Sequence, residues 1–275
     1  MPGRLIAATC QYPVDKDVRS NLSYTLMQME VARSRGADIA HFFECSLSGY
    51  AGMDLGHIRD QDEELLQHAL EEVGDKAREL NLWVILGSHH FGEGQTKPYN
   101  SLFLIDDQGE IQGRYDKRML TYEGGGSDMK HYLSGEAPLT FQIRGVSCGL
   151  MICHEWRYPE LYREYMRMNT ELVFQSWYDG NLTSSRYRES GKELGELIVG
   201  TVKGNAANNY LWISASNTSR KESCFPAFVV RPDGKIQNKM KRNIEGVLIT
   251  EVDTEKEFSD PTSHLRHHVN QYIQY

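Results

Sequence analysis

Short apolar runs alternate with amphipathic stretches along most of the chain. The apolar runs have the length of buried strands, whereas the amphipathic stretches repeat their apolar residues at the helical period of about 3.6. Strands are predicted at residues 4–12, 38–47, 82–91, 100–107, 111–115, 139–144, 146–152, 171–177, 210–217 and 246–252. Helices are predicted at residues 18–35, 62–81, 159–168 and 184–209, and a hairpin around Pro232-Asp233-Gly234. This order indicates a layered α/β fold with mixed sheets.

The length of the chain allows a full hydrophobic core. With 275 residues, we expect a single domain over residues 1–275. Residues 260–275 lack a strong pattern and are expected to form a tail that is either solvated or packed on a partner subunit. His264, His267 and His268 lie in this tail without a carboxylate at ligand spacing, so we predict no metal site there.

Net charge and cysteine usage narrow the class of protein. A net charge of −8, from 30 basic and 38 acidic residues, argues against a surface for nucleic acid or for an anionic membrane. No apolar run approaches the roughly 20 residues of a membrane-spanning helix, and residues 1–12 are too strand-like for a signal peptide. An odd number of scattered cysteines without a Cys-x-x-Cys pair is typical of free thiols in a reducing compartment. We therefore expect a cytoplasmic protein of enzyme size. The cysteines are Cys10, Cys45, Cys148, Cys153 and Cys224.

The stretch GLMICHEWRYPE at residues 149–160 carries the first candidate for chemistry. Its apolar run predicts a buried strand that ends at Ile152, and Pro159 predicts the first turn of a helix. Cys153 then lies near a helix N-terminus, where unpaired N–H groups and the helix dipole favour an anion. A thiol at such a place has a lowered pKa and is a candidate nucleophile. The alternative is a buried core cysteine.

Two further polar residues accompany apolar strands. Glu44 follows Phe42 and Phe43 near the end of one run, and Lys117 comes directly after the strand at 111–115. A buried carboxylate is costly to desolvate unless it has a partner or a task. Because strand ends converge at one edge of a layered α/β fold, we expect Glu44, Lys117 and Cys153 to lie together. The carboxylate can take the thiol proton and later activate water, and the ammonium can stabilise the negative charge that develops when a thiolate adds to a carbonyl or nitrile carbon.

These three residues lie in motifs that resemble the nitrilase superfamily, the carbon–nitrogen hydrolases with a Glu-Lys-Cys triad. The motifs are HFFECSLSGY around Glu44, RYDKRMLTYE around Lys117 and GLMICHEWRYPELYRE around Cys153. The similarity extends over residues 4–253 and includes the segments VFQSW, GNAANNYLWISASNTS, VVRPDGKI and GVLITEVD. The resemblance implies a four-layer αββα sandwich and assembly as a homodimer or a higher homo-oligomer.

The resemblance also implies a role for each site residue. Glu44 would be the general base, Lys117 would stabilise the oxyanion, and Cys153 would form the covalent acyl-enzyme. The backbone N–H of His154 would complete the oxyanion hole, and Glu123 would be the second glutamate that many members carry after the lysine. Four aromatic residues near strand ends are expected either to line the substrate pocket or to belong to the core: Tyr50, Tyr122, Trp177 and Tyr178.

The predicted activity is hydrolysis of a non-peptide C–N bond in a small linear amide or an N-carbamoyl compound, without a metal or organic cofactor. Hydrolysis of a nitrile by the same triad is the alternative. His154-Glu155 falls between the Tyr-Asp or Asn-Asp of many amidases and the Trp-Glu of nitrile-hydrolysing members. Residues 224–228, CFPAF, replace a Gly-x-Ser that relatives often show, so both departures concern the substrate rather than the triad.

Two other interpretations compete with a cysteine hydrolase. Residues 145–149, GVSCG, fit the Gly-x-Ser-x-Gly nucleophile elbow, but that motif requires a helix after Ser147, and here the apolar strand continues. The second is a catalytically inactive binding protein, in which Glu44 and Lys117 form a buried ion pair and Cys153 is a core residue. A thiol-reactive probe distinguishes this protein from an enzyme, because a core cysteine is inert at neutral pH.

Overall fold

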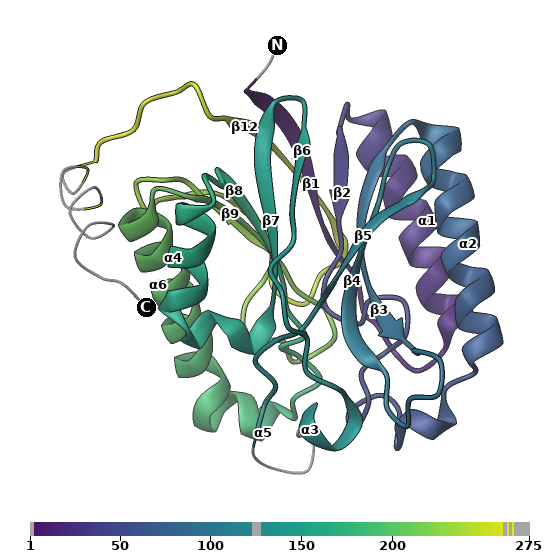
Figure 1. Cartoon of the computed structure of the whole chain (residues 1–275). Helices are drawn as coiled ribbons and strands as arrows, with labels where there is room; N and C mark the ends of the chain where they lie inside the picture. Colours follow the sequence, from purple (N-terminus) through teal and green to yellow (C-terminus); the bar gives the residue numbers. More distant parts are fainter. Residues whose placement is uncertain (1–2, 123–127, 261–262, 264–265, 267–275) are drawn as a thin grey trace.

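The chain folds into four layers, with two sheets in the middle and helices on both outer faces (Figure 1). The computed structural model describes residues 3–122, 128–260, 263 and 266. The outer helices are α1 (Val18–Ser34), α2 (Glu63–Leu80), α4 (Pro159–Arg167) and α6 (Lys192–Asn209). Helices α1 and α2 cover one sheet, and α4 and α6 cover the other. The predicted αββα sandwich is confirmed.

Each sheet has six strands with three parallel strands at its centre. The first sheet has the order β12-β1-β2-β3-β4-β5, and the second has the order β11-β10-β9-β8-β7-β6. In both, the central strands (β1, β2 and β3; β7, β8 and β9) are parallel and the outer ones antiparallel, so both sheets are mixed, as predicted. The first sheet contains β1 (Arg4–Gln11), β2 (Ile39–His41), β3 (Trp83–His90), β4 (Tyr99–Ile105), β5 (Ile111–Asp116) and β12 (Gly246–Asp253). The second contains β6 (Thr140–Ile143), β7 (Val146–Ile152), β8 (Leu172–Ser176), β9 (Trp212–Ser216), β10 (Phe228–Val230) and β11 (Ile236–Lys239).

The central strands carry mostly apolar residues because both of their faces are buried. In β7, Leu150 packs in the core between the two sheets, and its neighbour Met151 packs in the core beneath α4 and α6. In β8, Phe174 packs in the core between the two sheets and Val173 packs in the core beneath α4 and α6. A strand that is covered on both faces shows a continuous apolar run instead of alternation, and each such side chain stabilises the fold by roughly 1.5–3 kcal/mol.

The run at 38–47 departs from its prediction, because only Ile39–His41 is a strand. From Glu44 the chain turns, and Cys45 has a positive φ of 52°. The turn lies against β3, where Leu47 donates its N–H to the carbonyl of Gly87 at 2.9 Å. A Cβ on Gly87 would lie 2.1 Å from the carbonyl oxygen of Phe43, so only glycine permits this approach. The second half of this apolar run is therefore a buried turn and not a continuation of the strand.

Several short helical elements complete the described chain. They are α3 (Asp128–His131), α5 (Ser184–Arg186), 3₁₀ helices at Ile58–Asp60 and Cys153–Arg157, and a π-helical segment at Tyr187–Gly191 that leads directly into α6. The helix predicted at 184–209 is thus present, with a change of helical type. All five cysteines are free thiols, as their pattern predicted. Among the helices that the structure describes, none is long and apolar enough to cross a bilayer.

A neutral hydrogen-bonded group, the inter-sheet seam, crosses the space between the sheets. It consists of Thr9, His41, Ser176 and Ser214, which are all fully buried. The imidazole of His41 on β2 bonds to the hydroxyls of Ser214 and Ser176 on the opposite sheet, at 2.9 Å each. The Ser214 hydroxyl also bonds to that of Thr9 at 2.8 Å, and Ser176 donates to the carbonyl of Phe42 at 2.8 Å.

Candidate active site

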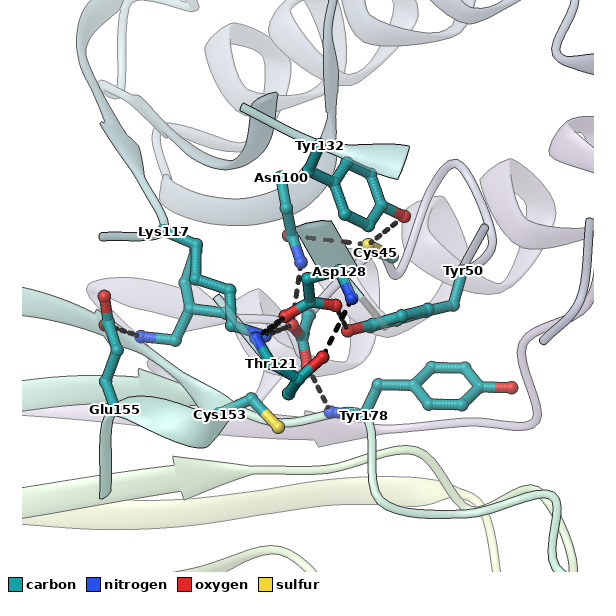
Figure 2. A network of polar contacts seen from close by, with 12 residues as sticks. Cys45, Tyr50, Asn100, Lys117, Thr121, Asp128, Tyr132, Cys153, Glu155 and Tyr178 are labelled. Carbon is teal, nitrogen blue, oxygen red and sulfur yellow. Dashed lines mark hydrogen bonds and ion pairs between the residues drawn. The ribbon is translucent and has the colours of Figure 1, made fainter. Parts of the chain in front are cut away.

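Three polar side chains from the two sheets meet where their strands end. Glu44 lies three residues after β2, Lys117 directly follows β5, and Cys153 directly follows β7. The Lys117 ammonium donates to Oε1 of Glu44 at 2.7 Å, and both side chains are fully buried. The thiol of Cys153 lies beside this pair, close enough for its charge state to be coupled to the Glu44 carboxylate. The structure thus brings together the three residues that the sequence selected, and Figure 2 shows Lys117 and Cys153 within one cluster.

Both turns of the candidate site contain a left-handed residue. Cys45, next to Glu44, has a φ of 52°, and Cys153 itself has a φ of 40°. Residues with a side chain rarely adopt this conformation, and it costs on the order of 1–3 kcal/mol unless the surrounding packing enforces it. Strain of this kind concentrates at functional sites.

The carboxylate of Glu44 is held on both oxygens. Oε1 accepts hydrogen bonds from Lys117 and from the Nδ2 amide of Asn100, at 2.7 Å each, and Oε2 accepts the backbone N–H of Tyr178 at 2.9 Å. Burial raises the pKa of Glu44, and the negative charge of Asp128 adds to the increase, while the charge of Lys117 opposes it. A carboxylate with a raised pKa is a better proton acceptor than an ordinary glutamate.

Asp128 is a second carboxylate on the same ammonium, and the sequence analysis did not select it. Its Oδ2 lies 2.7 Å from Nζ of Lys117 and accepts the backbone N–H of Thr121 at 2.9 Å, and its Oδ1 accepts the hydroxyl of Tyr50. Burial alone would raise the pKa of Asp128, but Lys117, Thr121 and Tyr50 together hold this pKa below its usual range. The two carboxylates also hold the pKa of Lys117 well above its usual value, although burial favours the neutral amine. Asp128 therefore keeps the lysine charged.

The structure corrects the prediction that Cys153 lies at the start of the longer helix and has a lowered pKa. The helix that begins at Pro159 starts six residues later, and Cys153 instead opens the short 3₁₀ helix at Cys153–Arg157. Burial, followed by the nearby charge of Glu44, raises the pKa of the thiol well above its usual value, and Lys117 and the N–H of Tyr178 only partly oppose this. Cys153 is thus a thiol at rest rather than a thiolate, because desolvation outweighs the local dipole. A neighbouring base must take its proton when it reacts.

The other predicted residues have different positions. Glu123 lies outside the described residues. Tyr122 is 78% exposed and does not belong to the buried cluster, so its place in a pocket wall stays a prediction. Trp177 is fully buried and packs edge-on against Phe225 in the core beneath α6, which makes it a core residue.

Tyr50 and Tyr178 do border the cluster. The Tyr50 ring lies below the Lys117 ammonium, with 5.9 Å between Nζ and the ring centroid. Tyr178 donates its hydroxyl to Asp54 at 2.7 Å, and its ring centroid lies 4.8 Å from that of Tyr50. Asn100 was also missed by sequence reasoning. It occupies the second position of β4 and gave no signal, since a single polar residue at a strand start is common.

The arrangement suits nucleophilic catalysis at an electrophilic carbon. It offers a thiol, a base in contact with it, and a cation whose charge is maintained by a second carboxylate. In the described part of the chain, no group of three or more His, Cys, Asp or Glu side chains is arranged to hold a metal ion. Ser147 lies within the paired strand β7, opposite Gln142 on β6, so it lacks the strand–turn–helix context of a nucleophile elbow.

Comparison with known proteins agrees with this chemistry. The family described as carbon-nitrogen hydrolase matches residues 6–257. An N-carbamoylputrescine amidase from Arabidopsis thaliana is 23% identical over 271 residues, which cover 90% of this chain and 86% of the relative. A glutamine-dependent NAD(+) synthetase from Thermotoga maritima is 28% identical over 147 residues, 52% of this chain, and the chain spans only 24% of that longer protein.

A solved structure shows the same fold. It is an amidase from Nesterenkonia sp. AN1 in complex with butyramide, and it superimposes with a TM-score of 0.79 at 17% sequence identity. The match covers 98% of this chain and 97% of the amidase. Another structure of that amidase shows covalent addition of the acetamide moiety of fluoroacetamide at its active-site cysteine.

Proposed function

The chain belongs to the carbon–nitrogen hydrolase family, and we propose that it hydrolyses the C–N bond of a small linear amide or N-carbamoyl compound through an acyl-enzyme on Cys153. The observation that carries this proposal is the buried Glu44–Lys117–Asp128 group in contact with a half-buried thiol. The amidases among the relatives support the substrate class. The product would be ammonia or an amine together with the acid.

The first half of the reaction forms the thioester. As the sulfur of Cys153 forms a bond to the carbonyl carbon, its proton moves to Glu44 and the carbonyl π electrons move to the oxygen. Because the pKa values of the thiol and of Glu44 are both raised, a direct transfer between them avoids a free thiolate. When the C–N bond breaks, the leaving nitrogen takes the proton from Glu44.

The second half releases the acid. Glu44 takes a proton from water as the water oxygen adds to the thioester carbon, the C–S bond then breaks, and the sulfur regains a proton. In both halves, Lys117 stabilises the oxyanion, and Asp128 keeps this lysine protonated. His154 is the second residue of a 3₁₀ helix, where backbone N–H groups lack partners within the helix, and its N–H would be the second donor to the oxyanion.

Two tyrosines are proposed to shape the pocket. Tyr50 and Tyr178 adjoin the cluster and present aromatic surface next to its charges. The homo-oligomer and the packing of residues 260–275 on a partner that the resemblance implies both stay predictions.

Intact mass tests the proposed nucleophile. Wild-type protein and Cys153→Ala are incubated with amides, N-carbamoyl compounds and nitriles, and ammonia release is followed in parallel. We expect an acyl adduct and ammonia with wild type and a loss of more than about 10³-fold in rate for Cys153→Ala, because no other nucleophile replaces the thiol. Release of ammonia from nitriles alone would assign the alternative substrate class to the same triad.

Cys148→Ala is the matched control. Cys148 is a fully buried cysteine of β7, five residues before Cys153, and it belongs to the core between the sheets. This variant should keep the adduct and the activity. A wild type that forms no adduct and releases no ammonia across the panel would contradict the proposed function and favour a protein with this fold that only binds its ligand.

A further inference from the structure

The two catalytic loops are joined by a buried carboxylate that the proposed reaction does not use. We propose that Glu155 is a positioning residue, which holds the loop of Lys117 and the loop of Cys153 at a set separation across the two sheets. This inference rests on the proposed function of Cys153 and Lys117, but it can be tested separately through the reactivity of the thiol.

The carboxylate of Glu155 accepts hydrogen bonds from both loops. Oε1 accepts the backbone N–H of Arg118 at 2.7 Å and a weaker one from Met119 at 3.4 Å. Oε2 accepts the backbone N–H of Ile152 at 2.6 Å. The hydroxyl of Tyr115 lies 2.8 Å from both carboxylate oxygens. The side chain is fully buried.

These partners lie next to the reacting residues in the sequence. Arg118 directly follows Lys117 after β5 of the first sheet, and Ile152 directly precedes Cys153 at the end of β7 of the second. No strand pairing joins β5 to β7, since they belong to different sheets. Glu155 therefore connects the two sheets at the point where the site is assembled, and Figure 2 shows it beside Lys117 and Cys153.

The interaction requires the ionised carboxylate. All of the groups around it are donors, namely three backbone N–H groups and a hydroxyl. Burial raises the pKa of Glu155, and the N–H groups of Ile152 and Arg118 with the Tyr115 hydroxyl oppose this increase. A glutamine has nearly the same shape, but its NH₂ group would face a backbone N–H on one side and leave that donor without an acceptor.

Glu155 acts through backbone groups, not on the reacting atoms. Its hydrogen bonds within the described chain go to neighbours of Lys117 and Cys153 rather than to Nζ or Sγ. Its loss should therefore alter the distance between the loops, and a misplacement of about 1 Å can reduce a rate by roughly 10²-fold. Binding of the substrate would change far less.

The test compares Glu155→Gln with Glu171→Gln. Glu171 is a matched control because Oε2 of its carboxylate accepts the backbone N–H of Ser147 at 2.9 Å, near the opposite end of β7. We expect Glu155→Gln to lower kcat by about 10–100-fold with KM within about 3-fold, and to slow alkylation of Cys153 by iodoacetamide. Glu171→Gln should change neither quantity.

Two outcomes would overturn the inference. The first is a Glu155→Gln protein with a lowered Tm but wild-type kcat and alkylation rate, which would make Glu155 a structural residue only. If Glu155→Gln does not fold, Tyr115→Phe decides, because it removes one donor to the carboxylate and leaves the backbone donors in place, while Arg118 Nε loses the hydroxyl that accepts from it at 3.2 Å. It should lower kcat by about 3–10-fold at unchanged KM, and wild-type kcat in this variant is the second contrary outcome.

The alkylation rate separates this inference from the proposed function. If no substrate is found for the wild type, the proposed hydrolysis fails, but the reactivity of Cys153 still reports its position relative to Glu44. Slower alkylation in Glu155→Gln alone would then support the positioning role without the hydrolase. Equal alkylation in all three proteins would contradict it whether or not hydrolysis occurs.

Discussion

Two buried polar groups lie between the same two sheets, and they differ in charge. The inter-sheet seam of Thr9, His41, Ser176 and Ser214 is neutral, and it joins strand to strand through hydroxyls and an imidazole. The candidate catalytic cluster of Glu44, Lys117, Asp128 and Cys153 lies beyond the strand ends and contains two carboxylates for one ammonium. Both groups are shielded from water, so burial does not distinguish them.

The response of each group to burial does distinguish them. In the seam, burial lowers the pKa of His41 to about 3, so the ring stays neutral at physiological pH and both of its nitrogens have hydroxyl partners. In the candidate catalytic cluster, Lys117 and Asp128 keep their charges, because the pKa of Lys117 is raised and that of Asp128 is lowered, whereas burial raises the pKa of Glu44. Such a divergence is typical of acid–base sites.

Backbone conformation points the same way. Cys153, a member of the candidate catalytic cluster, and Cys45, which adjoins Glu44, are both left-handed residues in tight turns. The seam residues instead belong to regular strands. Charge without full neutralisation, together with a strained turn, therefore distinguishes the candidate site from the seam, and both features are typical of functional sites.

Replacement of Lys117, the ammonium of the cluster, should have the largest effect on both activity and stability. In Lys117→Met, the cluster loses its only cation, and one of the two carboxylates must take up a proton. We expect kcat to fall by more than about 10³-fold, since the oxyanion loses its charged donor. Removing one partner of a buried pair should also destabilise the fold by roughly 3–5 kcal/mol. Rates of ammonia release and thermal unfolding measure the two effects.

Lys76→Met is the control for this change. Lys76 on α2 pairs with Glu30 and Glu79 near the surface, at 3.3 and 2.8 Å. Its replacement should alter stability by no more than about 1 kcal/mol and leave kcat unchanged. A Lys117→Met protein with more than a tenth of the wild-type kcat would show that the charge is not needed for the reaction.

Asp128→Asn should change the pH dependence of kcat/KM. The negative charge of Asp128 raises the pKa of Glu44, so its removal makes the ionised base easier to form and lowers that pKa. The acid limb of kcat/KM, which falls as Glu44 gains a proton, should move to lower pH, while kcat drops by about 10–100-fold because Lys117 loses a partner.

The matched control is Asp106→Asn. Asp106 is a buried carboxylate in the turn after β4 and accepts the backbone N–H groups of Gln108 and Glu110 at 2.9 Å. Its replacement should leave the acid limb where it is in wild type. An acid limb that stays in place in Asp128→Asn as well would assign that limb to a group other than Glu44.

Most of the fold could be read from the sequence because nearly every central strand is buried on both faces. The runs around Leu150 and Phe174 are continuous, short and bounded by turn residues, so their type and order were predictable. The run that contains Phe42 and Leu47 was misread for the same reason. A buried turn also needs apolar side chains, and the glycine that permits it, Gly87, belongs to another strand.

The site was predictable as far as each residue ended its own strand. Lys117 and Cys153 satisfied this rule, Glu44 lies in the buried turn three residues after β2, and the resemblance to a family selected all three. Asp128 did not satisfy the rule, since it opens the one-turn helix α3 and reaches Lys117 only through the fold. The raised pKa of Cys153 was equally inaccessible, because a sequence shows the helix that follows but not how deeply the thiol is buried.

The seam itself supplies the smallest expected effect on activity. In His41→Leu, the Ser214 hydroxyl keeps Thr9 and the Ser176 hydroxyl keeps the carbonyl of Phe42, so neither is left without a partner. We expect a loss of stability of roughly 1–3 kcal/mol from the missing hydrogen bonds and altered packing. The value of kcat should stay within about 3-fold of wild type, as measured by ammonia release.

The pH dependence of unfolding then tests whether His41 is the neutral group of this comparison. Its pKa is about 3 in the folded protein and about 6.5 in the unfolded chain, so the unfolded state binds the proton first. Wild-type stability is therefore lost as pH falls below about 6.5, by up to about 1.4 kcal/mol per pH unit from this residue. His41→Leu lacks that loss, whereas His89, whose pKa is also about 3, contributes equally to both proteins. The stability advantage of wild type over His41→Leu should thus fall from pH 7 to pH 4, and an advantage that stays constant would mean that His41 takes up its proton at the same pH in the folded and the unfolded states.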